Sequence, residues 1–237
     1  MNLEIMGKKQ YERFDKLYGI GSSDILNSKK IIIFGVGGVG SFAAEALIRS
    51  GIGHLTMVDP DLVEISNLNR QLQATHLTIG SLKVEAMKER LITINPDANI
   101  IARDVFFDEE ISEEFDFSEY DYIIDAIDSV KSKILLIEKA KKEGSPIISS
   151  MGAGNKKDPT AFKITDISKT KICPLARIVR KAVRELGLED IKVVWSEEIP
   201  TKSNNSAERS PGSSAFVPSV AGLIIASEVV SDLLEVI

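Results

Sequence analysis

The chain has 237 residues, of which 43% are hydrophobic and 27% charged, and a formal net charge of −6. This composition is typical of a globular protein with a sizeable core, and the negative charge argues against non-specific binding to nucleic acid. A single cysteine excludes a disulfide framework and zinc-binding Cys-x-x-Cys pairs, which favours a reducing, cytoplasmic location. No apolar signal segment follows Met1, and the most apolar tract, around 223–226, is too short to span a bilayer, so no membrane association is expected.

The first 28 residues are predicted to form an arm ahead of the first strand. Phe14, Leu17 and Tyr18 lie at helical spacing and are expected to dock on the body of the protein. Arg13 is either a solvated surface charge or a residue that is delivered to a phosphate. Sequence spacing does not decide between these two interpretations.

Residues 30–50 predict a strand, a glycine-rich turn and a helix. In the turn, which includes Gly38, Gly35 allows a sharp exit from the strand and Gly37 lets backbone N–H groups approach a phosphate. Gly40 lets the helix pack closely on the strand. Because a helix start offers unpaired amides and the positive end of a dipole, the turn is predicted to bind a nucleotide. A purely structural turn is the alternative.

A second strand is predicted over 54–58, and it ends at Asp59. Asp59 follows the glycine turn by about twenty residues, where an acid binds ribose hydroxyls in dinucleotide-binding folds. Asp61 suits a hard cation such as Mg²⁺, and Arg70 offers a planar fork for phosphate oxygens. The loop that begins there gathers polar side chains at the edge where open parallel sheets bind ligands: Asp61, Asn67, Asn69, Arg70 and Gln71. This loop favours a nucleoside triphosphate with a metal over a dinucleotide, with a plain polar loop as the alternative.

A helix is predicted to begin near Lys83, with a buried face formed by Val84, Met87, Leu91 and Ile94. Lys83 lies in the first turn, where the helix dipole disfavours a cation. A bound anion would remove this penalty, so Lys83 is interpreted as a phosphate contact. A surface lysine that extends toward solvent is the alternative.

The next segments continue the alternation of strands and helices. The strands are predicted over 99–103, 120–125 and 146–151, the helix over 131–143, and a solvated acidic connection over 104–119. Asp125 and Asp128 flank a turn that continues into Ser129, all at the ligand edge. One acid is expected to cap a helix and the other to serve a metal or phosphate, and Asp128 is favoured for function because it lies farther out.

After Met151 the alternation stops. Predicted elements are a half-exposed, antiparallel strand over 162–167, a helix over 174–187, a short strand over 192–196, a mobile lid or substrate loop over 201–214, and a last helix over 219–236. We therefore expect an α/β fold: a Rossmann-like, mostly parallel twisted sheet with helices on both faces and an antiparallel C-terminal extension. Residues 29–151 are expected to form the nucleotide-binding core and 152–237 an extension of the same domain.

The helix over 174–187 is predicted to be amphipathic. Its expected apolar face is Leu175, Ile178, Val179, Ala182, Val183 and Leu186. Between residues 163 and 184, Asp166 is the only acid, and the cations are Lys163, Lys169, Lys171, Arg177, Arg180, Lys181 and Arg184. This basic stretch is either a solvated helix face or a contact for the phosphate backbone of RNA.

Several motifs in this order resemble the ATP-dependent adenylating enzymes related to ubiquitin-activating enzyme, which include the activators of the molybdopterin and thiamine pathways. The motifs are the Gly-x-Gly-Gly-x-Gly turn, the acid that ends the second strand, residues 66–71, Lys83 and residues 125–128. The resemblance covers about residues 13–151. It implies that ATP and Mg²⁺ bind at the glycine turn, and that a carboxylate attacks the α-phosphate to give an acyl-adenylate and pyrophosphate.

The resemblance also implies roles for single residues. Asp59 would hold the ribose, and Asn67, Arg70 and Lys83 would line the phosphates. Asp128 would serve the Mg²⁺ side of the site. Arg13 would reach the ATP of the partner subunit in a homodimer. A requirement for a monovalent cation is left open, and no zinc is expected.

The C-terminal half is similar to the branch of this family that acts on N6-threonylcarbamoyladenosine in tRNA. The matching segments are 152–154, 158–160, 165–170, 174–176 and 212–218. This similarity implies that the threonyl carboxylate of the modified base is adenylated, and that an internal nucleophile then closes a ring with overall loss of water. The alternative is adenylation of a ubiquitin-like sulphur-carrier protein. The absence of zinc-binding cysteine pairs, and of groups other than Lys171 that would activate Cys173, favours the tRNA branch. A sulphur-transfer protein as a further partner is left open.

Overall fold

The computed structural model describes residues 9–201 and 211–235. In this part of the chain seven strands form one sheet in the order β3-β2-β1-β4-β5-β7-β6. All neighbouring strands are parallel except β6 and β7, which are antiparallel. The strands are β1 (Lys30–Phe34), β2 (His54–Val58), β3 (Asn99–Arg103), β4 (Tyr122–Asp125), β5 (Ile147–Ser150), β6 (Phe162–Asp166) and β7 (Lys192–Ser196). The expected fold class is confirmed.

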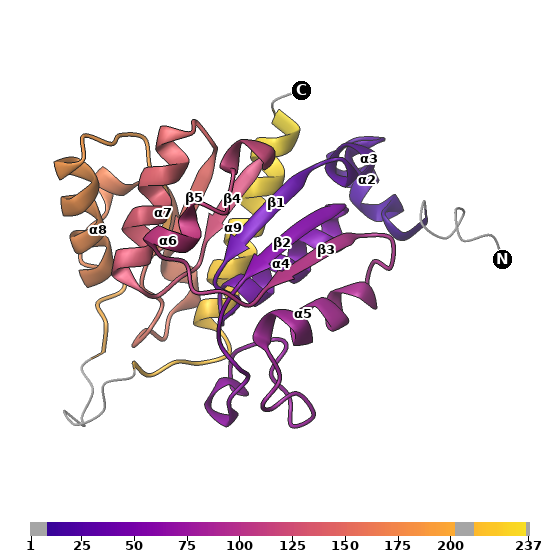
Figure 1. Cartoon of the computed structure of the whole chain (residues 1–237), viewed down its shortest axis with the longest axis horizontal. Helices are drawn as coiled ribbons and strands as arrows, with labels where there is room; N and C mark the ends of the chain where they lie inside the picture. Colours follow the sequence, from indigo (N-terminus) through magenta and orange to yellow (C-terminus); the bar gives the residue numbers. More distant parts are fainter. Residues whose placement is uncertain (1–8, 202–210, 236–237) are drawn as a thin grey trace.

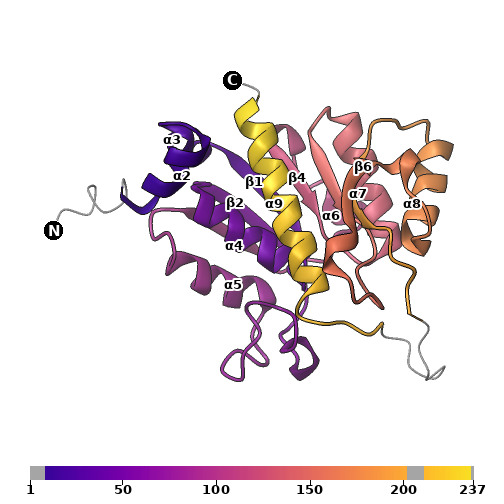
Figure 2. The same cartoon turned by 180° about the vertical axis from the view of Figure 1, so that it is seen from behind.

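Helices cover both faces of this sheet. They are α2 (Glu12–Tyr18), α3 (Ser22–Asn27), α4 (Gly40–Ser50), α5 (Lys83–Ile92), α6 (Glu109–Ser112), α7 (Val130–Lys142), α8 (Pro174–Glu185) and α9 (Val217–Glu235). Helices α6, α7 and α8 lie on the face seen in Figure 1, and α4 and α9 lie on the face seen in Figure 2.

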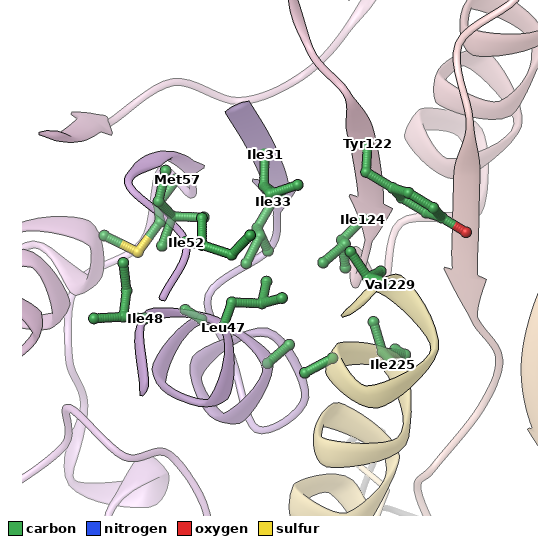
Figure 3. Close-up of a cluster of buried hydrophobic side chains, with 14 of the residues drawn as sticks. Ile31, Ile33, Leu47, Ile48, Ile52, Met57, Tyr122, Ile124, Ile225 and Val229 are labelled. Carbon is green, nitrogen blue, oxygen red and sulfur yellow. The ribbon is translucent and has the colours of Figure 1, made fainter. Parts of the chain in front are cut away.

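The sheet divides the core into two layers, and strand β1 contributes to both. Its side chains alternate: Ile31 and Ile33 pack in the cluster that contains residues of α4, α5 and α9, and Figure 3 shows part of this cluster. Ile32 and Phe34 pack in the cluster that contains residues of α7 and α8. Because both faces are covered, the strand is apolar at every position after Lys30, as expected for a buried parallel strand.

The segment 104–119 differs from the expected solvated connection. It contains α6 and three buried aromatic residues, Phe107, Phe115 and Phe117. Their rings meet the ring of Phe34 edge-on, with centroid distances of 4.7, 5.4 and 5.7 Å. The acids that surround these aromatic residues in the sequence stay at the surface or cap α6, so the acidic composition concealed a part of the core.

The chain changes direction across the sheet next to β1. It proceeds from β1 to β2 and β3, then crosses back to β4 on the other side of β1. In open α/β sheets, ligands bind outside the carboxyl ends of the strands at such a switch point. The glycine turn after β1 and the turn after β4 therefore meet at the position where a ligand is expected.

Helix α8 is buried through part of the expected apolar face, which includes Val179 and Val183. Its buried residues are Ala176, Val179 and Val183, whereas Ile178 and Leu186 are 47% and 44% exposed. The helix packs against α7 through these small and β-branched side chains. Two apolar residues of the expected face therefore remain at the surface.

Helix α9 is more apolar than the short tract around 223–226 indicates. By length and composition alone it is a candidate membrane span, with a mean hydropathy of 1.6 in its most apolar window. However, 56% of that window is buried, largely against α4, which is the pattern of a core helix in a soluble protein. The close approach occurs at Gly222, where a Cβ atom would lie 2.2 Å from the carbonyl oxygen of Val39.

Replacement of Gly222 tests this contact between helices. We expect Gly222→Ala to lower the free energy of unfolding by about 1–3 kcal/mol, because the added methyl group forces α9 away from α4. Ser227→Ala, at an exposed position of the same helix, is the control and should change stability by less than about 0.5 kcal/mol. Urea unfolding measures both, and equal stability of the two variants would contradict the close packing.

Candidate active site

The glycine turn has the backbone geometry that its sequence predicts. Gly35 has φ +88°, and a Cβ atom there would lie 2.6 Å from the carbonyl oxygen of Ala126. A Cβ atom on Gly40 would lie 1.8 Å from the carbonyl oxygen of Gly35. The structural roles expected for Gly35 and Gly40 are confirmed. Helix α4 begins directly after the turn, and no side chain caps its first amides, so they suit an anion.

Asp59 connects the glycine turn to the loop after β2. Its buried carboxylate accepts hydrogen bonds from the amides of Val36 (2.7 Å) and Asp61 (3.0 Å). Burial raises the pKa of the Asp59 carboxyl above its usual range, although the Lys83 charge and the two amides act in the opposite direction. Because a carboxylate can accept about four hydrogen bonds, Asp59 keeps capacity for the predicted ribose contact.

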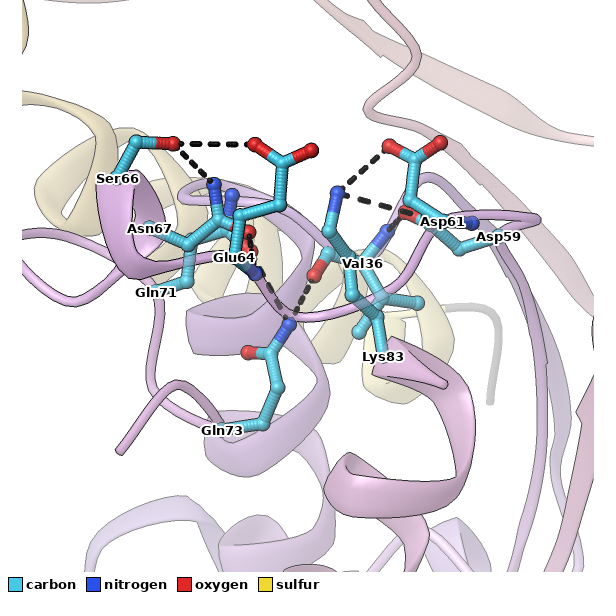
Figure 4. A network of polar contacts seen from close by, with 9 residues as sticks. All are labelled: Val36, Asp59, Asp61, Glu64, Ser66, Asn67, Gln71, Gln73 and Lys83. Carbon is cyan, nitrogen blue, oxygen red and sulfur yellow. Dashed lines mark hydrogen bonds and ion pairs between the residues drawn. The ribbon is translucent and has the colours of Figure 1, made fainter. Parts of the chain in front are cut away.

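Lys83 lies beside Asp61, and both side chains are visible in Figure 4. The Lys83 Nζ atom is 2.7 Å from Asp61 Oδ2 and 3.9 Å from Asp59 Oδ1. The backbone places them together, because the Lys83 amide donates to the Asp61 carbonyl and Leu62 pairs with Leu82. The Lys83 side chain is only 9% exposed, so it is not a solvated surface lysine. Asp61 balances the charge of Lys83.

Amide side chains of the loop after β2 support the backbone of the site. Asn67 is buried, and its Oδ1 accepts from the amide of Glu64 in a capping box. Gln73, which the motif analysis did not single out, donates to the carbonyl of Val36 (2.6 Å) and to Gln71 Oε1 (3.3 Å), as Figure 4 shows. Its own Oε1 is buried without a partner among the described residues. Gln73 thus supports the glycine turn, a role that only the fold reveals.

Asn69 and Arg70 lie at the open side of the turn. Arg70 Nη1 donates to the carbonyl of Ser66 (2.8 Å) and to Asn69 Oδ1 (3.0 Å). Asn69 Nδ2 donates to the carbonyl of Ser213 (3.0 Å). A Cβ atom on Gly38 would lie 3.1 Å from Pro218, so the first turn of α9 also contacts the glycine turn.

The Asp125 side chain lies in the core, and not at the ligand edge of the sheet where it was expected. Its side chain is fully buried, and its Oδ2 is 2.7 Å from Nζ of the equally buried Lys133. Lys133 also donates to Ser149 Oγ (3.3 Å) and to the carbonyl of Ser150 (3.0 Å), which joins the ends of β4 and β5. The Asp125 carboxylate is therefore enclosed in the core and is not presented to a nucleotide. The reason is a lysine eight residues later in the chain that folds back from α7.

The remainder of this turn stays at the surface. Asp125 Oδ1 accepts from the amide of Ile127 (3.1 Å), which fixes the turn that carries the exposed Asp128. Neither acid caps α7; the cap is Ser129, whose Oγ accepts from the amide of Ser132. Cofactor contacts of Asp128 and Ser129 stay predictions.

Arg13 lies at the opposite edge of the sheet from the glycine turn of its own chain. It is exposed on α2, and the residues before α2 bind the C-terminal ends of the helices: Gln10 donates to Ile94, and Tyr11 to Ile48. These helix ends lie at the amino edge, because each helix runs antiparallel to the strands. A contact between Arg13 and a phosphate at the glycine turn therefore requires a second copy of the chain.

The loop after β5 holds both ends of a long segment. Asn155, at φ +59°, donates its amide to Gly212 and accepts the Gly212 amide on its own Oδ1 (2.7 Å). Its carbonyl accepts from Thr201. Of the predicted mobile loop 201–214, residues 202–210 lie outside the described residues, and Gly212 is held by Asn155.

The thiol of Cys173 is buried, and its surroundings differ from those expected. Lys156, which is also buried and donates to the carbonyl of Ser196 (3.3 Å), lies close enough to influence it. Burial lowers the pKa of Lys156, and Cys173 and Glu198 act in the opposite direction. A thioester relay needs an accessible thiolate, which a residue at 2% exposure does not offer.

The carboxylates at this edge fit a phosphate-bound Mg²⁺ ion. Within the described ranges, no group of three or more His, Cys, Asp or Glu residues is placed to hold a metal by itself. Mg²⁺ bound with a nucleotide needs only one or two carboxylates, since phosphates and water complete its shell. Asp61, whose side chain is 64% exposed, and the exposed Asp128 meet that need.

The seven cations of the basic stretch divide into two groups. Lys163 and Lys181 form ion pairs with glutamates, and Arg180 donates to Thr170. The others are exposed and form no ion pair within the described part of the chain: Lys169, Lys171, Arg177 and Arg184.

Comparisons with known proteins support the same family. The ThiF family model matches residues 9–236. A tRNA threonylcarbamoyladenosine dehydratase of Bacillus subtilis is 44% identical over 95% of both chains. The crystal structure of the Escherichia coli tRNA N6-threonylcarbamoyladenosine dehydratase TcdA in complex with ATP has a TM-score of 0.90 at 31% identity, and covers 96% of this chain and 95% of that one. The adenylyltransferase and sulfurtransferase UBA4 of Saccharomyces cerevisiae is 29% identical over 70% of this chain and 39% of its own length.

The buried pair below the turn gives a testable prediction. We expect Lys133→Met to lower the free energy of unfolding by about 3–5 kcal/mol, because it leaves the Asp125 carboxylate buried without a counter-ion. Lys133→Met combined with Asp125→Asn should recover part of this loss. Lys131→Met is the control, since that lysine is 77% exposed. A single Lys133→Met variant as stable as the control in urea unfolding would contradict the assignment.

Proposed function

Because this chain belongs to the ThiF family, we propose that it is an ATP-dependent enzyme that adenylates the threonyl carboxylate of N6-threonylcarbamoyladenosine in tRNA and closes it into a ring. The observation that carries this proposal is the 44% identity to a dehydratase of that name over 95% of both chains. The polar edge at the end of β1 supports it. Its uncapped helix start, Asp59 and Lys83 suit a nucleotide with several phosphates.

The proposed reaction has two steps. In the first, a carboxylate oxygen of the substrate attacks the α-phosphorus of ATP, the bond to the β-phosphate breaks, and pyrophosphate leaves. In the second, a nucleophilic atom of the neighbouring carbamoyl group attacks the acyl carbon and loses its proton to solvent, the bond between the acyl carbon and the phosphate-bound oxygen breaks, and AMP leaves with that carboxylate oxygen. The modified base loses the elements of water overall, while ATP becomes AMP and pyrophosphate.

The cations of the site would stabilise the charge that develops on the phosphates. Lys83 would exchange its pairing with Asp61 for a phosphate, and Arg70 would contribute a planar donor fork. The exchange frees Asp61, which with Asp128 would hold Mg²⁺. Bound Mg²⁺ would neutralise phosphate charge and orient the triphosphate.

Activation of a sulphur-carrier protein is the second candidate function. The family includes proteins with this role, and the ATP site would be the same. The chain has a single cysteine, and Cys173 is 2% exposed. Ring closure within the substrate needs no enzyme thiol, so this burial favours the tRNA substrate. A tRNA substrate also accords with the predicted cytoplasmic location.

A turnover assay distinguishes the two substrates. We expect pyrophosphate release and loss of the modified nucleoside by mass spectrometry with tRNA that carries N6-threonylcarbamoyladenosine, and no release with a carrier protein ending in Gly-Gly. Lys83→Ala should lower turnover by about 10²–10³-fold, because it removes a donor to the phosphates. Lys88→Ala, on the same helix, is the control. Turnover with the carrier alone would refute the proposed substrate, and near-normal turnover of Lys83→Ala would refute the role of Lys83.

We also propose a homodimer in which Arg13 completes the site of the partner. Arg13 and the glycine turn lie at opposite edges of one chain, so only a second copy brings them together. Arg13→Ala and Lys83→Ala should each be inactive alone. An equimolar, refolded mixture should regain about a quarter of wild-type turnover, since half of the dimers then contain one intact site. No recovery in the mixture would contradict the shared site.

A further inference from the structure

A groove runs along α8, apart from the glycine turn. It encloses about 1030 Å³ between α8, the 3-10 turn at Ile167–Lys169 and the residues 187–190 that precede β7. Its floor is apolar, with Ile167 and Val183 among the lining residues. Nothing in the proposed adenylation chemistry uses this groove.

One cationic stripe of α8 lines the groove. Arg177, Arg180, Lys181 and Arg184 follow the spacing i, i+3, i+4 and i+7, which places them on the same side of a helix. Arg180 is held in place, because its Nη1 donates to the carbonyl (2.7 Å) and to the Oγ1 (2.6 Å) of Thr170. These two bonds tie α8 to the end of the 3-10 turn at Ile167–Lys169, which forms the opposite wall of the groove.

The two outer arginines are available to a ligand. Arg177 and Arg184 are exposed and form no ion pair with any carboxylate of the described ranges. They lie two helical turns apart, about 10 Å. The Asp166 carboxylate is already occupied by the amides of Ser168 (2.8 Å) and Ile191 (2.9 Å). Two further acids, Glu189 and Asp190, line the groove beside the start of β7. The positively charged side of the groove is therefore the side that α8 forms.

The groove extends away from the ligand edge of the sheet. Helix α8 begins at that edge, since a Cβ atom on Gly152, after β5, would lie 3.5 Å from Cys173 Sγ. The other end lies at the amino edge, because Asp166 pairs with Lys192, the first residue of β7. The two edges are a five-residue strand apart, roughly 17 Å. A ligand that occupies both the glycine turn and this groove must therefore be long and anionic.

We propose that the groove along α8 binds the phosphate backbone of the tRNA, at nucleotides away from the base that is modified. The proposal rests on the proposed function, which supplies a long polyanion as substrate. Arg177 and Arg184 contact phosphates, and two further exposed cations, Lys169 and Lys171, lie in the segment that precedes α8. Contacts with phosphates fix the position of a nucleic acid without reading its sequence, so the groove orients the tRNA and leaves the chemistry to the glycine turn.

Charge reversal in the groove tests the proposal. The test variant is Arg177→Glu with Arg184→Glu, and the matched control is Lys16→Glu with Lys142→Glu, two lysines that are 70% and 68% exposed on other helices. Binding of tRNA is measured over a range of salt concentrations, and binding of ATP separately. We expect the test variant to bind tRNA at least about tenfold more weakly, with a salt slope reduced by about 2, and to bind ATP as before.

A charge-conserving variant separates charge from packing. Arg177→Lys with Arg184→Lys should keep tRNA affinity within about threefold, because a point charge is enough for a phosphate. The groove proposal is overturned if the test variant loses no more tRNA affinity than the control, or if it keeps the salt slope of the wild type. The proposed function remains intact in either case. Wild-type protein that binds tRNA through the groove but does not convert the modified base overturns the proposed function and leaves the groove intact.

Discussion

The candidate site depends on the buried carboxylate of Asp59. It accepts the amides of Val36 and Asp61, and so joins the turn after β1 to the loop after β2. Together with the bond from Gln73 to the carbonyl of Val36, these bonds fix the glycine turn relative to the loop that carries Arg70. Burial is unfavourable for the charged form and raises the pKa of Asp59, and the nearby Lys83 ammonium offsets part of that cost. The same lysine thereby supports the structure and faces the ligand edge.

A second buried carboxylate supports the other side of β1. Asp125 and Lys133 form an ion pair in the core, and through Ile127 this pair fixes the turn that carries Asp128. Gly35 contacts the same turn, because its backbone approaches the carbonyl of Ala126. The two turns at the switch point are thus held by buried charges, whereas the sheet beneath them is held by apolar packing. This division places polar groups at one edge of an otherwise apolar core.

Some cations of the chain stabilise the structure, and others are available to bind a ligand. Lys133 and Arg180 are occupied by acceptors of the protein itself, so their charges are not offered to a ligand. Lys83 is paired with the exposed Asp61, a partner that can be displaced by phosphate. Arg177 and Arg184 form no ion pair with the described residues. In a chain of net charge −6, these few cations mark where anionic ligands are expected.

Local patterns in the sequence determined the strands, most helices, the α/β class and the roles of Gly35 and Gly40, because hydrophobic period and turn chemistry act over a few residues. The motifs around Asp59, Arg70 and Lys83 also indicated the ligand edge. Only the tertiary structure decided that Asp125 is enclosed by Lys133, that Gln73 supports the glycine turn, and that Phe107 belongs to the core. It also decided which basic residues of α8 remain accessible. These features depend on contacts between distant segments, and the partner of a charge or of an aromatic ring is not encoded in its sequence neighbours.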